Sequence, residues 1–173
     1  NLCLRSEYSF KKTFGRIGQI RAFESKTIYI FDEIPDGATH MGIADIDNTY
    51  GHVIFQKECA KRNINPIFGV RLGVFSNLEK VKRAGYPYIF IAKNDEGLKE
   101  LYSLVTKSQK QFYYVPRTLL SDVKALSDNL FVIAINFEDP DRIDYIGLDP
   151  STCQMIANIE DIPKVAINTN FFN

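Results

Sequence analysis

The stretch "MGIADIDNTYGHVIFQKECAKRNINPIFGVRL" (41–72) carries the pattern that decides the fold. A short apolar run that ends on a carboxylate predicts a strand over 39–45. The residues that follow place apolar side chains four apart, which predicts a helix over 52–62. A second apolar run predicts a strand over 65–75, with its proline near the start, where a missing N–H is tolerated. The stretch therefore predicts a strand–helix–strand unit, from which parallel sheets are built.

The same alternation continues on both sides of this unit. Further strands are predicted at 1–5, 26–31, 86–92, 129–135, 144–148 and 163–168, and further helices at 93–109 and 115–127. Strands and helices at this spacing favour βα units in a mainly parallel sheet, in a barrel-like or open α/β fold of about seven strands. In a βα barrel, functional residues gather at the carboxyl ends of the strands, where Asp45, Arg71 and Asn168 are expected.

Composition narrows the class of protein. The chain has 173 residues, which suits one domain, and 45% of them are hydrophobic. Its 21 basic and 21 acidic residues cancel, so the overall charge does not favour a free-standing nucleic-acid binder. The basic run "EKVKR" (79–83) is interpreted as a solvated helix surface. No apolar stretch approaches the ~18 residues of a membrane span, and no signal peptide is visible.

Cysteine and histidine usage excludes several kinds of site. Cys3, Cys59 and Cys153 are far apart and odd in number, which disfavours a disulfide framework and fits a reducing cytoplasm. The two histidines, His40 and His52, are too few for a His-rich metal hydrolase. Because the first residue is Asn1 rather than Met, we expect the chain to be a segment of a longer protein.

Residues 45–49, "DIDNT", are the first local candidate for chemistry, although five residues are a weak signal. They match the D-x-D-x-T pattern of haloacid dehalogenase-like phosphatases, in which a carboxylate pair and Mg²⁺ act on phosphorus. That motif normally opens its domain, whereas here 44 residues precede it. A calcium loop does not fit, because Thr49 and Tyr50 stand where an oxygen-rich ligand and a glycine are needed.

The remaining candidates have ordinary structural interpretations. His52, on the first turn of a helix, is expected to be partly exposed or at the core edge, and His40 has no companion. Cys59 falls on the apolar face of its helix and is expected in the core. The aromatic run "QFYYVP" (111–116) suits either a packed loop or a surface on which bases stack.

One resemblance organises the whole chain. It covers, in the family's order, "LRSEYSF" (4–10), 41–72, "YIFIAKNDEGLKELYSLVTKS" (88–108), "RTLLSDVKALSDNLFVIA" (117–134) and "IPKVAINTNFFN" (162–173). These segments resemble the polymerase and histidinol phosphatase (PHP) domain of bacterial DNA polymerase III alpha subunits, the C-family replicative polymerases. Residues 11–40 match poorly, and the part between Asn136 and Ile162 is shortened. The resemblance implies a distorted TIM-like βα barrel of about seven strands.

Active members of that family bind about three metal ions through His, Asp and Glu at strand ends. Carried onto this sequence, the two opening histidines fall on Cys3 and Arg5. The Asp of "T-D-H" is kept as Asp45, and the His after it falls on Ile46. The Glu of the next strand falls on Arg71, the next His falls near Pro87, and the closing D-x-H falls on Thr169 and Phe171. Asp47 stands in place of a loop glycine. The resemblance therefore implies a catalytically degenerate site, with no metal, no cofactor and no catalytic residue in this segment.

Arg5 and Arg71 would repel divalent cations at this site. We hypothesise that one of them pairs with Asp45 instead. The resemblance then implies a single PHP-like domain over 1–173, at the N-terminal end of a longer DNA-directed DNA polymerase (a nucleotidyltransferase) that uses Mg²⁺ elsewhere. The implied partners are the polymerase core in cis, a proofreading exonuclease subunit, and DNA through the parent polymerase. The implied location is the cytoplasm, and no membrane partner is implied.

Two other classes of function stay open. One is a free-standing metal-dependent phosphoesterase with an altered metal set built from Asp45, Asp47 and Cys3. The other is a stand-alone adaptor that uses a PHP fold for protein–protein contact. Fold alone does not decide between them, because function depends on the site.

Overall fold

The computed structural model describes residues 31, 37–79, 84–135, 142–148 and 161–167. In these residues the elements follow in the order β1 (His40–Ile46), α1 (His52–Lys61), β2 (Asn65–Phe75), β3 (Tyr86–Ala92), α2 (Asp95–Lys110), β4 (Thr118–Leu119), α3 (Leu120–Lys124), β5 (Leu130–Ala134), β6 (Tyr145–Leu148) and β7 (Lys164–Ala166). No helix within this part of the chain is long and apolar enough to cross a membrane.

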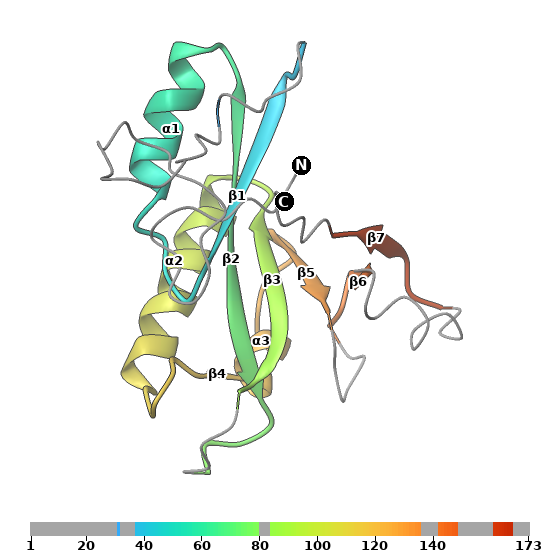
Figure 1. The fold of residues 1–173 in the computed structure, drawn as a ribbon. Coiled ribbons are helices and arrows are strands. Elements are labelled where there is room, and N and C mark those ends of the chain that lie inside the picture. Colours follow the sequence, from blue (N-terminus) through green and yellow to red (C-terminus); the bar gives the residue numbers. More distant parts are fainter. Residues whose placement is uncertain (1–30, 32–36, 80–83, 136–141, 149–160, 168–173) are drawn as a thin grey trace, which may run out of the picture.

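The strands form one mixed sheet that curls into a half-barrel (Figure 1). Its order is β1-β2-β3-β5-β6-β7, and β4 pairs with the end of β2. β3 runs antiparallel to both of its neighbours, whereas the other pairings are parallel. The connection between β2 and β3 spans ten residues, 76–85. Such a connection is shorter than a parallel crossover needs, so β3 returns in the opposite direction.

The two faces of the sheet bury separate clusters because successive side chains of a strand point to opposite faces. On one face, strand residues such as Val70 and Phe90 pack against Leu101 of α2. On the other face, isoleucines gather, including Ile89 and Ile133. The helix α1 packs over the first strand through a third cluster, made of Phe31, Met41, Ile43, Phe55, Cys59 and Ile64.

The start of α2 is fixed by two asparagines. The side-chain oxygen of Asn94 accepts a hydrogen bond from the Gly97 N–H at 2.8 Å, which caps the helix. The Asn94 amide also donates to the Asn129 side chain at 2.8 Å. The first turn of α2 lies so close to the segment before β5 that a Cβ built at Gly97 would overlap the carbonyl oxygen of Asn129. Gly97 is therefore required by close approach rather than by its own dihedral angles.

Most predicted elements are confirmed, with shifts of a few residues at their ends. The predicted helix over 115–127 is wrong over most of its length, because only Leu120–Lys124 is helical. The Arg117 N–H donates to the Ser108 carbonyl at 3.1 Å, and the next two residues pair with β2. These contacts hold the chain extended before the helix begins. The predicted strand at 1–5, and that at 26–31 apart from Phe31, lie outside the described residues.

Candidate functional site

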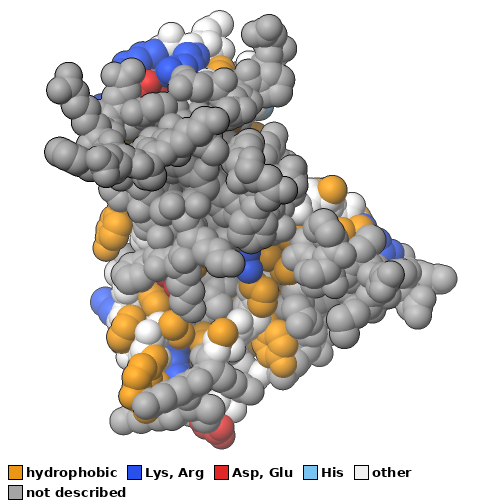
Figure 2. Space-filling model, viewed as in Figure 1, with side chains coloured by type: hydrophobic (Ala, Val, Ile, Leu, Met, Phe, Trp, Pro, Cys, Tyr) orange, Lys and Arg blue, Asp and Glu red, His pale blue; other side chains and the backbone are white. Residues whose placement is uncertain are grey.

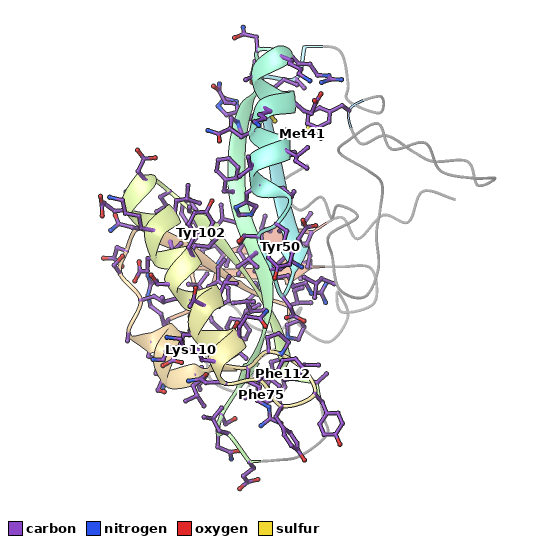
Figure 3. All side chains as sticks on the ribbon, turned by 90° about the vertical axis from the view of Figure 1, so that its left-hand side faces the viewer. Met41, Tyr50, Phe75, Tyr102, Lys110 and Phe112 are labelled. Atoms are coloured by element: carbon purple, nitrogen blue, oxygen red, sulfur yellow. The ribbon has the colours of Figure 1, made fainter. Side chains whose placement is uncertain are left out.

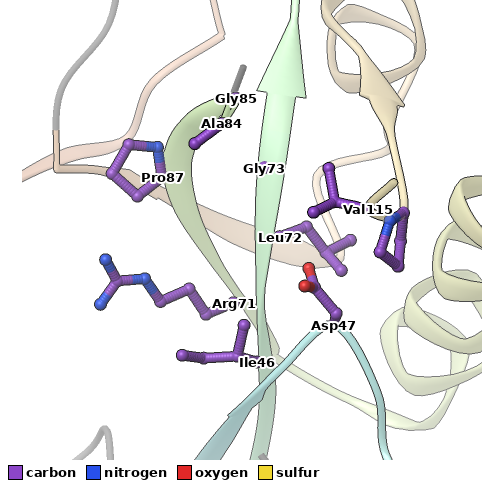
Figure 4. A pocket seen from close by; sticks show the side chains of 10 residues that line it. Ile46, Asp47, Arg71, Leu72, Gly73, Ala84, Gly85, Pro87 and Val115 are labelled. Carbon is purple, nitrogen blue, oxygen red and sulfur yellow. The ribbon is translucent and has the colours of Figure 1, made fainter. Parts of the chain in front are cut away.

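A pocket of about 140 Å³ opens in the sheet just beyond the end of β1 (Figure 4). Pairing between β1 and β2 stops at Ile46 and Arg71, and pairing between β4 and β2 starts at Val74. Neither strand pairs with Leu72 or Gly73 in between, so the sheet has a gap there. The pocket is lined by Ile46, Asp47, Arg71, Leu72, Gly73, Ala84, Gly85, Pro87, Val115 and Pro116.

Three positions that the family resemblance assigns to metal ligands meet at this pocket. Ile46, Arg71 and Pro87 come from the three neighbouring strands β1, β2 and β3, and in Figure 4 their side chains lie on the same side of β2. Arg71 is in the middle of β2, not at its carboxyl end as the sequence suggested. It reaches the pocket because β1 ends beside it. The positions Cys3, Arg5, Asn168, Thr169 and Phe171 lie outside the described residues.

Asp45 points away from this group of side chains. It is fully buried and pairs with Val70, whereas Ile46 pairs with Arg71. Since neighbouring residues leave a strand on opposite faces, Asp45 and Val70 lie on the face that packs against α2, and Arg71 lies on the other. The register therefore does not favour the hypothesised Arg71–Asp45 ion pair.

The "DIDNT" segment forms a tight turn that joins β1 to α1. Asp47 has a φ of 63°, in the left-handed region that aspartate tolerates better than most side chains. Its N–H donates to the Arg71 carbonyl at 2.9 Å, and its own carbonyl accepts from the Gln109 side chain at 2.8 Å. Asn48 completes the turn by donating to the Ile46 carbonyl at 3.0 Å. This geometry explains why Asp47 stands where the family has a glycine.

His52 is fully buried in the core, whereas the sequence suggested a partly exposed residue or one at the core edge. It is 2% exposed, and its ring packs against Phe68 and Tyr102. The Nε2 atom donates to the Gly69 carbonyl at 3.0 Å, which leaves Nδ1 as the acceptor for the Tyr102 hydroxyl at 3.3 Å. Burial lowers the pKa of His52 from 6.5 to about 4, against the opposing effect of its bond to Gly69. The neutral ring ties α1 to β2 and α2.

The described residues do not fit a metal cluster of the kind that the resemblance assigns to active members of the family. Ile46 and Pro87 offer no metal ligand, and Arg71 carries a positive charge. Asp47 supplies one carboxylate to the pocket, but the described part of the chain brings no three His, Cys, Asp or Glu side chains together as a metal site. Cys59 is buried in the core as predicted, and burial raises the pKa of its thiol to about 11. A thiol with so high a pKa is a poor metal ligand at neutral pH.

Sequence reasoning missed the role of the segment between α2 and β4. Val115 and Pro116 line the pocket, and the next residue, Arg117, is 2% exposed. The Arg117 guanidinium lies over the rings of Phe75 and Tyr113, at 5.0 and 4.9 Å from their centroids. The local pattern offered no clear signal, because proline is favoured in the first turn of a helix, where Pro116 would fall.

Comparisons with known proteins point to one family. The PHP domain family matches residues 29–172. The DNA polymerase III subunit alpha of Borreliella burgdorferi is 31% identical over 137 residues, which are 75% of this chain and 11% of that protein. The subunit of Staphylococcus aureus is 29% identical over 63% of this chain and 10% of that protein. The subunit of Chlamydia pneumoniae is 30% identical over 57% of this chain and 8% of that protein.

The matched region of each relative is short compared with the relative itself. The chain spans about a tenth of the length of these polymerase subunits. The family match, in contrast, covers most of this chain and includes every described strand. Together with the curled α/β sheet, this match shows that the chain belongs to the PHP domain family.

Proposed function

We propose that this chain is a non-catalytic PHP domain of a C-family replicative DNA polymerase, where it supports the polymerase core during DNA replication. Family membership and the similarity to three polymerase III alpha subunits support this context. The observation that carries the proposal is the pocket at the end of β1. Three ligand positions implied by the family meet there as Ile46, Arg71 and Pro87, and none of these side chains has an oxygen, nitrogen or sulfur lone pair to offer a metal.

Electrostatics adds to this argument. A divalent ion about 5 Å from the Arg71 guanidinium would be repelled by roughly 7 kcal/mol at an effective dielectric constant of about 20. The carboxylate of Asp47, which also lines the pocket, would offset part of this repulsion. Coordination normally supplies the free energy that overcomes such repulsion, and one carboxylate supplies less of it than a full set of ligands.

The proposed role includes the rest of a longer polymerase chain. Because the chain spans about a tenth of its relatives, we propose that it forms the N-terminal PHP segment of such a protein. Its partners would be the polymerase core in cis and a proofreading exonuclease subunit, in the cytoplasm. Nucleotide transfer, with its Mg²⁺ ions, would then reside in the rest of that chain.

The proposal predicts that two substitutions in the pocket create a metal site that the native chain lacks. Ile46 and Arg71 are directly opposite in the register, so the double variant Ile46→His/Arg71→Glu places two ligands on one face. We expect excess Zn²⁺ to raise the Tm of this variant and to leave that of the native chain unchanged, because a ligand that binds the folded state stabilises it. Differential scanning fluorimetry measures both.

The single variant Arg71→Gln is the matched control, since it removes the positive charge without adding a carboxylate. It should respond to Zn²⁺ less than the double variant does. A second assay follows hydrolysis of a p-nitrophenyl phosphodiester by the native chain with Mn²⁺, Zn²⁺ or Mg²⁺. Metal-dependent hydrolysis by the native chain that disappears in Asp47→Asn would refute the non-catalytic role and favour the phosphoesterase alternative.

A further inference from the structure

The turn that follows α2 presents aromatic rings to solvent. Phe112 is 56% exposed and Tyr114 is 59% exposed, although most large apolar side chains of the described residues are buried. Figure 3 shows Phe112 near the end of α2, close to Lys110. In Figure 2, hydrophobic side chains gather at the lower end of the molecule. Exposed aromatic side chains next to one another are a frequent sign of a binding surface.

The backbone of this turn is held in place. The Gln111 and Phe112 N–H groups donate to carbonyls in the last turn of α2, each at 3.2 Å. The Tyr113 N–H donates to the Val115 carbonyl at 3.1 Å, and Tyr114 between them has a φ of 62°. A left-handed conformation at an aromatic residue costs about 1–3 kcal/mol, and such strain persists where surrounding contacts enforce it. A turn fixed in this way loses little entropy when a ligand binds to its exposed rings.

The third ring of the turn links it to the body of the domain. The Tyr113 ring lies edge-on to that of Tyr114, with centroids 4.8 Å apart. The guanidinium of the buried Arg117 lies over Tyr113 on one side, and its Nη1 donates to the Glu79 carbonyl at 2.7 Å. Tyr113 therefore anchors the turn, and Phe112 and Tyr114 are its exposed rings.

The charge of the surrounding chain is positive. From residue 101 to residue 121 the sequence contains Lys107, Lys110 and Arg117 and no aspartate or glutamate. Lys107 pairs with Asp122 at 2.6 Å, whereas Lys110 is exposed beside the aromatic turn. Exposed aromatic rings beside an exposed lysine are complementary to a polyanion that has flat apolar faces.

We propose that residues 110–114 form a binding site for single-stranded nucleic acid. Bases stack on the rings of Phe112 and Tyr114, and Lys110 contacts a phosphate. A duplex does not offer its base faces to such rings, because they are already stacked within the helix. The proposal goes beyond the supporting role described above and does not depend on the rest of a polymerase.

The test is the fluorescence anisotropy of a labelled 12-nucleotide oligothymidine titrated with the 173-residue chain at low salt. We expect a Kd within about 10⁻⁴–10⁻⁶ M. Phe112→Ala and Tyr114→Asn should each weaken binding about fivefold or more, the lower limit for loss of one stacked base. Asparagine is chosen at position 114 because it tolerates a positive φ, so the variant keeps the turn.

Matched controls separate base stacking from non-specific electrostatic and hydrophobic binding. Tyr50→Ala removes an aromatic ring that is 69% exposed in a different connection, and it should leave the Kd unchanged. Lys110→Gln should reduce the slope of log K against log salt by about 0.7, whereas Lys99→Gln, earlier on α2, should not. A 12-mer without bases should bind at least about fivefold more weakly than oligothymidine.

Three results would overturn the proposal. One is the absence of binding up to about 100 µM chain, the weak limit for such complexes. Another is binding that neither ring substitution weakens, or that is equal for the 12-mer without bases. The third is self-association of the chain that Phe112→Ala abolishes while the oligonucleotide stays unbound, which would make the turn a protein-docking surface.

Discussion

Replacing Gly97 with alanine should destabilise the domain by about 2–4 kcal/mol, although the same change stabilises most helices by about 1 kcal/mol. The added Cβ would overlap the carbonyl oxygen of Asn129, so the first turn of α2 has to move away from the segment before β5. That oxygen also accepts a hydrogen bond from the Lys93 N–H at 2.9 Å. Overpacking and a weakened backbone hydrogen bond together account for the expected loss.

Urea unfolding followed by circular dichroism measures this effect. Ser103→Ala is the matched control, because Ser103 is an exposed position on the same helix and the change should alter stability by about 0.5 kcal/mol or less. A neutral or stabilising effect of Gly97→Ala would show that α2 does not pack this closely against Asn129.

Lowering the pH from 7 to 4 should remove about 3 kcal/mol of stability through His52. Its pKa is about 4 in the folded chain and 6.5 as a free side chain, so the unfolded state binds the proton more readily. The stabilising contribution is complete above pH 6.5, falls as the pH drops through that value, and is lost by about pH 4. The cause is burial, because only the neutral form of the ring can occupy this site without a large desolvation penalty.

The comparison with His52→Gln isolates this contribution, because other groups titrate alike in both chains. The glutamine amide can still donate to the Gly69 carbonyl but does not titrate. The free energy of unfolding of the variant, measured in urea at several pH values, should fall less steeply between pH 6.5 and 4. Parallel curves for the two chains would contradict a neutral, buried His52.

Strong periodic or continuous apolar patterns predicted the fold well. The strands β2 and β3 have the bounds that their apolar runs indicate. A strand in the middle of a covered sheet is buried on both faces, so its apolar run and the strand itself have the same extent. The helix prediction for residues 115–127 failed because their apolar spacing also suits an extended segment packed on α2. Contacts between residues distant in sequence, such as that of Arg117 with Glu79, favour the extended segment over the helix. Local pattern contains no information about such contacts.

The candidate site was predictable in position but not in geometry. The family resemblance located Ile46, Arg71 and Pro87, and the structure brings all three to one pocket. No sequence pattern indicated that β1 ends beside the middle of β2, which is what opens the gap. The hypothesis was that Arg5 or Arg71 pairs with Asp45, and the strand register places Asp45 and Arg71 on opposite faces. A one-residue step along a strand changes the face, and register is a tertiary property.

The metal content of the purified chain tests the central claim most directly. The chain is incubated with Zn²⁺, Mn²⁺ and Mg²⁺, dialysed without a chelator, and analysed by inductively coupled plasma mass spectrometry, with Ile46→His/Arg71→Glu treated in parallel. A site built from Ile46, Arg71 and Pro87 predicts far less than one retained ion per native chain and more in the double variant. Two or three tightly held ions per native chain would contradict the account.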